Sequence, residues 1–365
     1  KATGLDAIPG EAIKNLPENM KIALLHIFNM MWEISYTPAI WSEAVTTLLH
    51  KKESKTLLKN YRPITLLQTI FKTWEAVLET RTRLMMGKDY PPPLQMGSQK
   101  HNSAANAIMV TLSLMRQAEA LQQKIITLQI DMNKAYNRVS HKILWADLYQ
   151  FGIRGKLLKA IMSTYDKAME SIRIGAYKSD PFSLPNGLRQ GSVLSPVLYI
   201  LYTVKLLWAL QATNTGLQVE NKPNLPAIMF VDDLSSMAKT FNEALEQYIT
   251  VQEFALTHRC IINTNKSRAA TTGCLQTLTK NMDEAGMTLK PTTNYVHLGA
   301  KHQPDHKKTH MHPSPSTLHR CSKARAILSE MIARGLGNTH LRHEQMLDII
   351  DKRITKTITH GIASV

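Results

Sequence analysis

The sequence predicts an α+β fold, a chain that contains both helices and strands, and three observations lead to that prediction. Apolar residues make up 44% of the 365 residues, which is typical of a globular chain with a sizeable core. Segments with apolar residues at helical spacing alternate with short β-branched segments typical of strands. Two of the short segments lead into acids, Asp131 in one and the pair Asp232 and Asp233 in the other.

The chain carries a strong positive charge. Lys and Arg number 44 against 28 Asp and Glu, a formal net charge of +16. Such a surplus favours a polyanionic partner through long-range attraction and counterion release. The cysteines show neither a disulfide framework nor zinc spacing, which is consistent with a reducing compartment. No apolar run reaches the length of a membrane span and no signal peptide is visible, so no membrane partner is expected. Because the chain opens on Lys1, we expect it to be a piece of a longer polypeptide.

The first third of the chain is expected to be mostly helical, with one strand at residues 44–49. Basic residues follow this strand at Lys51 and Lys52, and Arg62 lies shortly after them. These residues could form a cationic clamp, since Arg grips phosphate with two hydrogen bonds and Lys acts as a point charge. A solvated basic loop is the simpler interpretation of this segment alone. Helices are predicted in residues 1–35, 71–86 and 103–122.

The central part of the chain holds the first acid. A strand at residues 124–130 is predicted to end at Asp131, and Tyr136 lies five residues beyond it. An acid that closes a buried strand lies at the edge of a sheet, where functional groups often lie. It could equally cap the helix that follows. Further helices are predicted at residues 141–151 and 155–168, and further strands at residues 171–175 and 179–184.

A glycine-flanked loop, GLRQGSVLSP at residues 187–196, opens a long apolar helix that is predicted to reach residue 210. Glycine permits close approach of the backbone to a ligand, and Pro196 suits a first helical turn. A capped loop without a chemical role would look the same. The loop therefore becomes informative only together with the acids on either side of it.

The segment IMFVDDL, at residues 228–234, is the one around which we expect the rest to be organised. Two adjacent acids in an otherwise buried segment are costly, because a buried charge must be paired or hold a metal. A strand–turn–strand hairpin would put both acids at its tip, exposed to a cation. An Asp-Asp pair by itself is most often an ordinary turn. Beyond it the sequence predicts a helix at residues 241–259, a strand at 260–263 followed by Lys266, and a hairpin turn at 295–299.

In their order and spacing these segments resemble the reverse transcriptases of non-LTR (LINE-type) retrotransposons. The resemblance is carried by NYRPITLL at residues 60–67, RQGSVLSP at 189–196 and FVDD at 230–233. It implies a right-hand polymerase fold with fingers, a palm built on a ferredoxin-like antiparallel sheet, and a helical thumb. The implied domains are fingers with an N-terminal extension at residues 1–122, a palm at 123–300 with fingers interleaved at about 140–185, and a basic linker with an incomplete thumb at 301–365.

The resemblance also implies an RNA-directed DNA polymerase that acts in retrotransposition, with an RNA template, a DNA primer and dNTPs as partners and the nucleus as its place of action. Asp131, Asp232 and Asp233 would hold two Mg²⁺ ions, or Mn²⁺ in their place. Carboxylate oxygens suit Mg²⁺, and two ions about 4 Å apart can stabilise both the attacking and the leaving oxygens. Lys266 matches a lysine that would protonate the departing pyrophosphate.

Further roles follow from the resemblance, position by position. Arg62, together with Lys51 or Lys52, would grip the triphosphate and neutralise charge on the leaving pyrophosphate. Tyr136 matches the steric gate, an aromatic ring that blocks a ribose 2′-hydroxyl. Gln190 and Gly191 would lie against the new base pair. The primer grip would be formed by His297, Leu298 and Gly299.

Some positions depart from the family pattern, and they keep alternatives open. Asn137 stands where Asp is usual and Leu5 where Pro is usual, which would suit a decayed, catalytically inactive copy that retains nucleic-acid binding. Loss of Asp131 or Asp232 would favour that alternative, and both are present. A group II intron or retron type of reverse transcriptase is the other alternative among enzymes. A basic interaction protein without enzyme ancestry would require all three motif matches to be coincidental.

Overall fold

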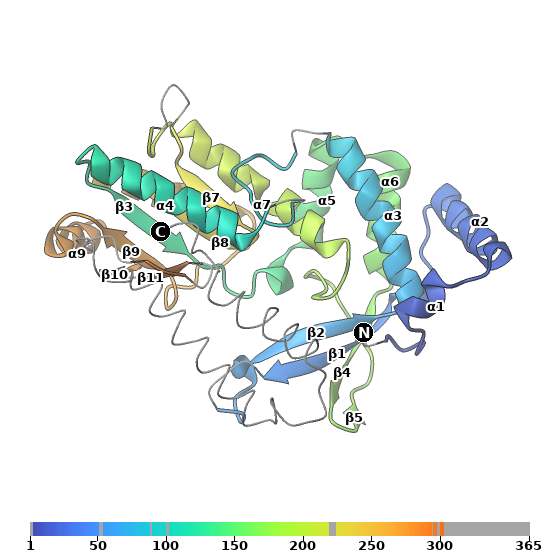
Figure 1. The fold of residues 1–365 in the computed structure, drawn as a ribbon. Coiled ribbons are helices and arrows are strands. Elements are labelled where there is room, and N and C mark those ends of the chain that lie inside the picture. The colour runs from blue at the N-terminus through green and yellow to red at the C-terminus, as the bar shows by residue number, and fades with distance from the viewer. Residues whose placement is uncertain are drawn as a thin grey trace, which may run out of the picture. The chain divides into compact units, whose positions relative to one another are not determined.

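The computed structural model describes residues 3–50, 54–87, 90–99, 102–218, 224–293, 295–297 and 300–302. The chain forms two compact units, each assembled from several stretches (Figure 1). Unit 1 consists of Lys1–Pro93, Lys134–Lys205 and Leu256–Cys260. Unit 2 consists of Leu94–Asn133, Leu206–Ala255 and Ile261–Val365. Each unit is described by itself below.

Unit 1 contains a five-stranded sheet with the order β2-β1-β4-β5, in which β6 also pairs with β4. Its strands are β1 (Glu43–His50), β2 (Tyr61–Leu67), β4 (Met169–Ile174), β5 (Tyr177–Lys178) and β6 (Phe182–Ser183). β1 is antiparallel to β2 and parallel to β4, so Thr46 lies opposite both Thr65 and Ile172. The predicted strands at residues 44–49 and 171–175 are confirmed, whereas the one at 179–184 is reduced to β6.

The helices of unit 1 bury a cluster of aromatic rings. Phe28 of α2 lies 5.6 Å from Trp74 of α3 and 6.1 Å from Trp41, measured between ring centroids. The buried indole of Trp74 donates a hydrogen bond to Thr37 Oγ1 at 3.1 Å, so its polar atom is satisfied. The helical segments are α1 (Gly10–Lys14), α2 (Glu18–Ile34), α3 (Thr69–Met86), α5 (His141–Gln150) and α6 (Gly155–Asp166), with short 3₁₀ turns η1 (Ala39–Ser42), η2 (Leu58–Asn60) and η3 (Tyr136–Arg138).

Unit 2 contains a sheet with the order β10-β9-β3-β8-β7. The central strand β3 is antiparallel to both β8 and β9, and β7 forms a hairpin with β8. The order β9-β3-β8-β7, with helix α8 between β8 and β9, is that of a ferredoxin-like sheet. The strands are β3 (Ile126–Ile130), β7 (Ala227–Phe230), β8 (Asp233–Ala238), β9 (Arg268–Thr271) and β10 (Lys290–Thr292).

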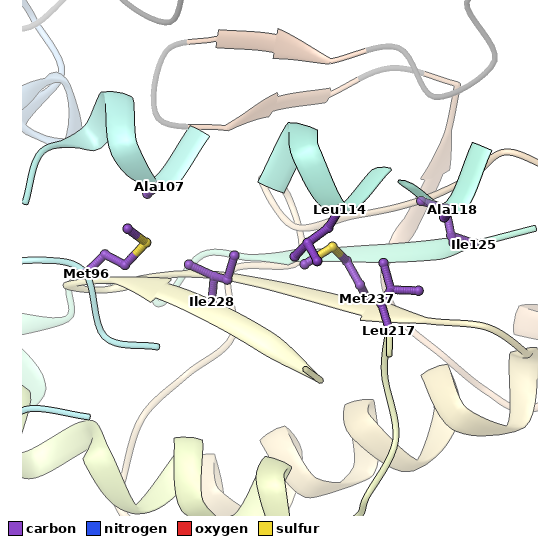
Figure 2. Packing of buried hydrophobic residues seen from close by; sticks show 8 residues of the cluster. All are labelled: Met96, Ala107, Leu114, Ala118, Ile125, Leu217, Ile228 and Met237. Atoms are coloured by element: carbon purple, nitrogen blue, oxygen red, sulfur yellow. The ribbon is translucent and has the colours of Figure 1, made fainter. Parts of the chain in front are cut away.

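One face of this sheet is covered by α4 (Ala104–Ala120), as Figure 2 shows. Leu114 of α4 packs in one apolar cluster with Ile228 of β7 and Met237 of β8. The opposite face of the sheet is also covered by helices (Figure 2), and this double cover explains why every residue of β8 after Asp233 is buried. The other helices that supply residues to unit 2 are α7 (Ser195–Ala212), α8 (Phe241–Thr257) and α9 (Leu275–Glu284).

Two parts of unit 2 differ from the sequence prediction. Residues 260–263 do not form the predicted strand, since Ile262 makes only a single bridge to Met132. The chain turns directly after this bridge, where Lys266 N and Ser267 N both donate to Asn263 O, at 3.0 Å and 2.8 Å. The strand lies later, at β9, whose sequence RAAT carries little apolar signal. Helix α9 was not predicted either, because it buries only Leu278 and Met282.

A short hairpin follows, in which β11 (Tyr295–His297) is antiparallel to β12 (Ala300–His302). This confirms the hairpin predicted around residues 295–299. Leu298, Gly299, Lys51, Lys52 and the chain from residue 303 onwards, which includes most of the predicted linker and thumb, lie outside the described residues. In the part of the chain that the structure describes, no helix combines the length and apolar character that a membrane span requires.

Shortening Ile228 should destabilise unit 2, because its side chain is 1% exposed and packs between α4 and the sheet. We expect Ile228→Ala to lower the free energy of unfolding by about 2–5 kcal/mol and Ile228→Val by about 0.5–1.5 kcal/mol. Urea denaturation of the full chain measures both. Leu256→Ala removes a side chain that is 81% exposed, so it should change the value by less than about 0.5 kcal/mol. Equal effects of Ile228→Ala and Leu256→Ala would contradict the packing described.

Candidate active site

Three carboxylates of unit 2 lie at one end of adjacent strands. Asp131 follows β3 directly, Asp232 lies in the turn after β7, and Asp233 opens β8. β3 and β8 pair with Ile130 opposite Leu234, so the next pair in this antiparallel register is Asp131 and Asp233. The hairpin predicted for the Asp-Asp pair is confirmed. Strand pairing thus brings an acid from far away in the sequence to the tip of that hairpin.

The three carboxylates influence one another electrostatically. The pKa of Asp233 is raised from its ordinary value of 3.8 to about 6. Burial is the largest cause, the charges of Asp232 and Asp131 act in the same direction, and Lys266 opposes them. Such an effect requires the carboxyl groups to lie near one another. A positive charge bound beside them would favour the ionised form of Asp233.

The segment after α8 holds Asp131 through both its backbone and its side chain. Lys266 Nζ lies 3.2 Å from Asp131 Oδ1 and 3.4 Å from Oδ2. Asn263 Nδ2 donates to Oδ2 at 2.9 Å, and the backbone N–H of Asp131 donates to Ser267 Oγ at 3.1 Å. The alternative in which Asp131 caps the following helix is not what the structure shows, because its oxygens accept from Asn263 and Lys266.

The three acids suit Mg²⁺ in donor type and in charge. Mg²⁺ binds hard carboxylate oxygens, commonly one or two of them, and completes its shell with water and substrate phosphates. Among the described residues no group of three or more His, Cys, Asp or Glu side chains is arranged to hold an ion directly. The oxygens of Asp131 are engaged by the Lys266 ammonium and the Asn263 amide. The Lys266 side chain is 68% exposed, so this ion pair adds little stability and can be exchanged for another cation.

In unit 1 the glycine-flanked loop docks on β2. The backbone N–H of Thr65 donates to Gln190 O at 2.8 Å. Gly191 has φ +142°, and a Cβ there would lie 2.2 Å from Thr65 O, so no other residue fits without moving the strand or the loop. The side chain of Gln190 donates to Asn137 Oδ1 at 3.4 Å. Asn137 therefore has a local role in the loop, whatever residue its relatives carry.

The buried acid Glu75 holds the same loop through hydrogen bonds. Glu75 of α3 is 1% exposed, and its two oxygens accept hydrogen bonds from Ser192 Oγ at 2.6 Å and Val193 N at 3.0 Å. Arg189 lies nearby, donates to Ser42 O at 2.8 Å and stacks over the ring of Tyr165. Burial is the main cause that raises the pKa of Glu75 to about 7, although Ser192 and Arg189 pull it down in part. The sequence offered one signal for Glu75, an acid on the apolar face of an amphipathic helix.

Tyr136 is tied to this loop as well. Its ring stacks on Tyr199, with centroids 4.9 Å apart and planes 11° from parallel, and its carbonyl accepts from Leu188 N at 2.8 Å. Arg62 lies exposed on β2, opposite Leu49. His297 ends β11 opposite Ala300.

Each unit therefore gathers part of the predicted set. Unit 2 gathers the acids and Lys266, and unit 1 gathers Tyr136 and the Gln190–Gly191 loop. The polar partners of these groups were not predicted as functional residues: they are Asn263 in unit 2 and Glu75 in unit 1.

The raised pKa of Glu75 predicts a pH-dependent stability. Between pH 4.5 and about 7 the folded chain keeps a proton on Glu75 that the unfolded chain has lost, so stability falls as pH rises through this window. A shift of this size corresponds to on the order of 3 kcal/mol. We expect Glu75→Gln, measured by urea denaturation at pH 5 and pH 8, to lose less stability on going to pH 8 than the wild type does. Identical pH dependence in both proteins would contradict this assignment.

Comparison with known proteins identifies the family. Residues 49–309 match the reverse transcriptase (RNA-dependent DNA polymerase) family. The chain is 25% identical over 318 residues to the probable RNA-directed DNA polymerase from transposon BS of Drosophila melanogaster. The aligned residues cover 82% of this chain and 33% of that protein. This chain is 24% identical over 276 residues to the RNA-directed DNA polymerase from mobile element jockey of the same species, covering 73% and 29%. The chain thus spans about a third of the length of these relatives.

Solved structures show the same fold at low sequence identity. Apo telomerase from Candida tropicalis superposes with a TM-score of 0.52 at 12% identity, covering 96% of this chain and 63% of that one. Telomerase from Candida albicans, solved in complex with a fragment of telomeric RNA, gives a TM-score of 0.51 at 10% identity, covering 94% and 60%. The right-hand polymerase fold predicted from the sequence is thereby confirmed, together with the resemblance to non-LTR retrotransposon enzymes. The chain belongs to the reverse transcriptase (RNA-dependent DNA polymerase) family.

Proposed function

We propose that this chain is the polymerase portion of a retrotransposon RNA-directed DNA polymerase, which extends the 3′-hydroxyl of a DNA primer along an RNA template with dNTPs. The observation that carries the proposal is the set of three carboxylates at the end of β3 and the tip of the β7–β8 hairpin. Its support comes from the family match and from relatives that are RNA-directed DNA polymerases of mobile elements. Both Asp131 and Asp232 are in place, which argues against a decayed copy.

In this proposal Asp131, Asp232 and Asp233 hold Mg²⁺ or Mn²⁺ ions. When bound, two such ions supply positive charge to the attacking and leaving oxygens of nucleotidyl transfer. The residues around the acids keep them oriented: Asn263 fixes one oxygen of Asp131 at 2.9 Å. Lys266 neutralises Asp131 when no other cation is present, and its exposed ammonium is available to give a proton to the departing pyrophosphate.

The residues of unit 1 are proposed to handle the nucleotide. Arg62, with Lys51 or Lys52, would bind the triphosphate, and Tyr136 would exclude a ribose 2′-hydroxyl. The stacking of Tyr136 on Tyr199 supports the gate role, because a ring held by a second ring makes a firm steric barrier. The Gln190–Gly191 loop would lie against the new base pair, and the primer grip would be His297, Leu298 and Gly299.

The domain assignment remains part of the proposal. We assign the fingers to residues 1–122, with a further piece at about 140–185, the palm to 123–300 and the linker and thumb to 301–365. The net charge of +16 suits contact with the phosphates of a template–primer duplex. Action in the nucleus follows from the resemblance to retrotransposon enzymes.

Replacing Asp232 tests the proposed activity most directly. We expect the wild type to extend a DNA primer on an RNA template with Mg²⁺ and dNTPs, and Asp232→Asn to lose at least about 10³-fold in rate, because the acid is proposed to bind metal in the transition state. Binding of primer–template, measured by fluorescence anisotropy, should stay within about twofold because phosphate contacts dominate it.

Asp283→Asn is the matched control, since Asp283 is an exposed acid on α9 of the same unit, and it should extend primers at the wild-type rate. Equal loss of binding and synthesis in Asp232→Asn would count against the proposed role of Asp232. Binding without extension in the wild type would favour an inactive copy.

Replacing Tyr136 tests the steric gate. We expect Tyr136→Ala to raise incorporation of ribonucleotides relative to deoxynucleotides by on the order of tenfold or more, since removing the ring leaves space for a 2′-hydroxyl. The ratio of kcat/KM for rGTP and dGTP measures it. Tyr177→Ala removes an aromatic ring from unit 1 that is 84% exposed and should leave the ratio unchanged. An unchanged ratio in Tyr136→Ala would exclude the gate role.

A further inference from the structure

Gln95 is a buried polar residue of unit 2 that lies outside the set of acids and nucleotide-binding residues. It is 1% exposed, and it lies in a short segment that pairs with the outer edge of β7. Met229 N donates to Leu94 O and Met96 N donates to Met229 O, both at 2.8 Å. The segment is therefore fastened to the strand that leads into the Asp-Asp turn.

The amide of Gln95 binds the backbone of Val231, the residue that immediately precedes Asp232. Its Oε1 accepts hydrogen bonds from Val231 N at 2.9 Å and from Gly97 N at 3.0 Å. Two N–H donors around Oε1 fix the orientation of the amide, so Nε2 faces Val231 O at 3.4 Å. One buried side chain thus engages both backbone polar groups of Val231.

Val231 has a backbone conformation that its side chain disfavours. Phe230 pairs with Asp233, so Val231 and Asp232 form a two-residue hairpin loop. Such loops need positive φ and usually carry Gly, Asn or Asp. Val231 has φ +60°, which is an outlier for a β-branched residue and persists only where the surroundings hold it.

Gly97, two residues after Gln95, also packs closely against Val231. A Cβ at Gly97 would lie 2.5 Å from both the N and the Cγ2 of Val231. The segment therefore approaches Val231 more closely than any side-chain-bearing residue would allow. Gln95 and Gly97 together leave Val231 little room to leave the left-handed region.

We propose that Gln95 is a positioning residue for the two hairpin acids: it holds Val231 in the left-handed conformation and thereby sets the direction of Asp232 and Asp233. The proposal rests on the proposed polymerase function for its catalytic consequence, whereas the effect on the turn itself does not depend on activity. Gln95 touches no reacting atom, so it acts only through the backbone of Val231.

Gln247 offers a matched control in the same unit. It is also fully buried, and its amide donates to Met237 O and to Thr215 Oγ1, each at 2.9 Å. Met237 lies on β8 toward the end away from the acids. Loss of this amide removes a buried polar contact to the sheet without touching the Asp-Asp turn.

The activity test replaces each glutamine with methionine, which has a similar size and no amide. For Gln95→Met we expect kcat of primer extension to fall by about tenfold or more, with KM for dNTP and the Kd for primer–template within about twofold, because only the geometry of the acids changes. Gln247→Met should keep kcat per folded molecule within about twofold. Adding Val231→Gly to Gln95→Met should restore at least about threefold in kcat, because glycine adopts positive φ without penalty.

Amide hydrogen exchange of the full chain tests the clamp independently of activity. The peptide that spans residues 228–234 should exchange at least about tenfold faster in Gln95→Met than in the wild type or in Gln247→Met, since the Val231 amide loses its acceptor. If the wild type proves inactive, this result still decides on the clamp while the proposed function fails separately. Unchanged exchange at this peptide, equal losses of kcat in the two methionine variants, or no gain from Val231→Gly would each overturn the proposal.

Discussion

The pairing of β3 with β8 is the interaction on which the candidate site depends. This register places Asp131, at the end of one strand, beside Asp233, at the start of the other. Gathering carboxylates in this way is unfavourable by itself: burial is the main cause that raises the pKa of Asp233 to about 6, and the charges of Asp232 and Asp131 raise it further. The apolar cluster between α4 and the sheet, which includes Ile228 of β7 and Met237 of β8, holds the strands together and offsets this cost (Figure 2).

Both units fix a functional segment by the same physical means. A buried polar side chain from a distant part of the sequence accepts backbone N–H groups of that segment: Glu75 binds Val193, and Gln95 binds Val231. In each case a glycine also permits a backbone approach that a Cβ would block, Gly191 against Thr65 and Gly97 against Val231. Buried groups of this kind are costly unless they are satisfied, so they define one conformation of the loop they hold.

The acids and their partners also show how charge is balanced before a cation binds. Lys266 and Asn263 both engage the carboxylate of Asp131. An exposed ammonium is a replaceable partner, because an ion pair open to water contributes little. In the proposed metal binding, a metal ion would therefore replace the Lys266 ammonium as the positive charge beside Asp131.

The sequence by itself determined most of the strands and helices, the Asp-Asp hairpin, the end of β3 at Asp131 and the family resemblance. The elements and the hairpin depend on local periodicity and turn chemistry, which neighbouring residues set. The family resemblance depends on the motifs NYRPITLL, RQGSVLSP and FVDD. The sequence misplaced the strand before Lys266 and missed α9, because RAAT at β9 and the two buried residues of α9 give weak apolar patterns. Only the tertiary structure revealed that Asn263, Gln95 and Glu75 hold the functional segments, since each acts on residues remote in sequence and strand register brings such partners together.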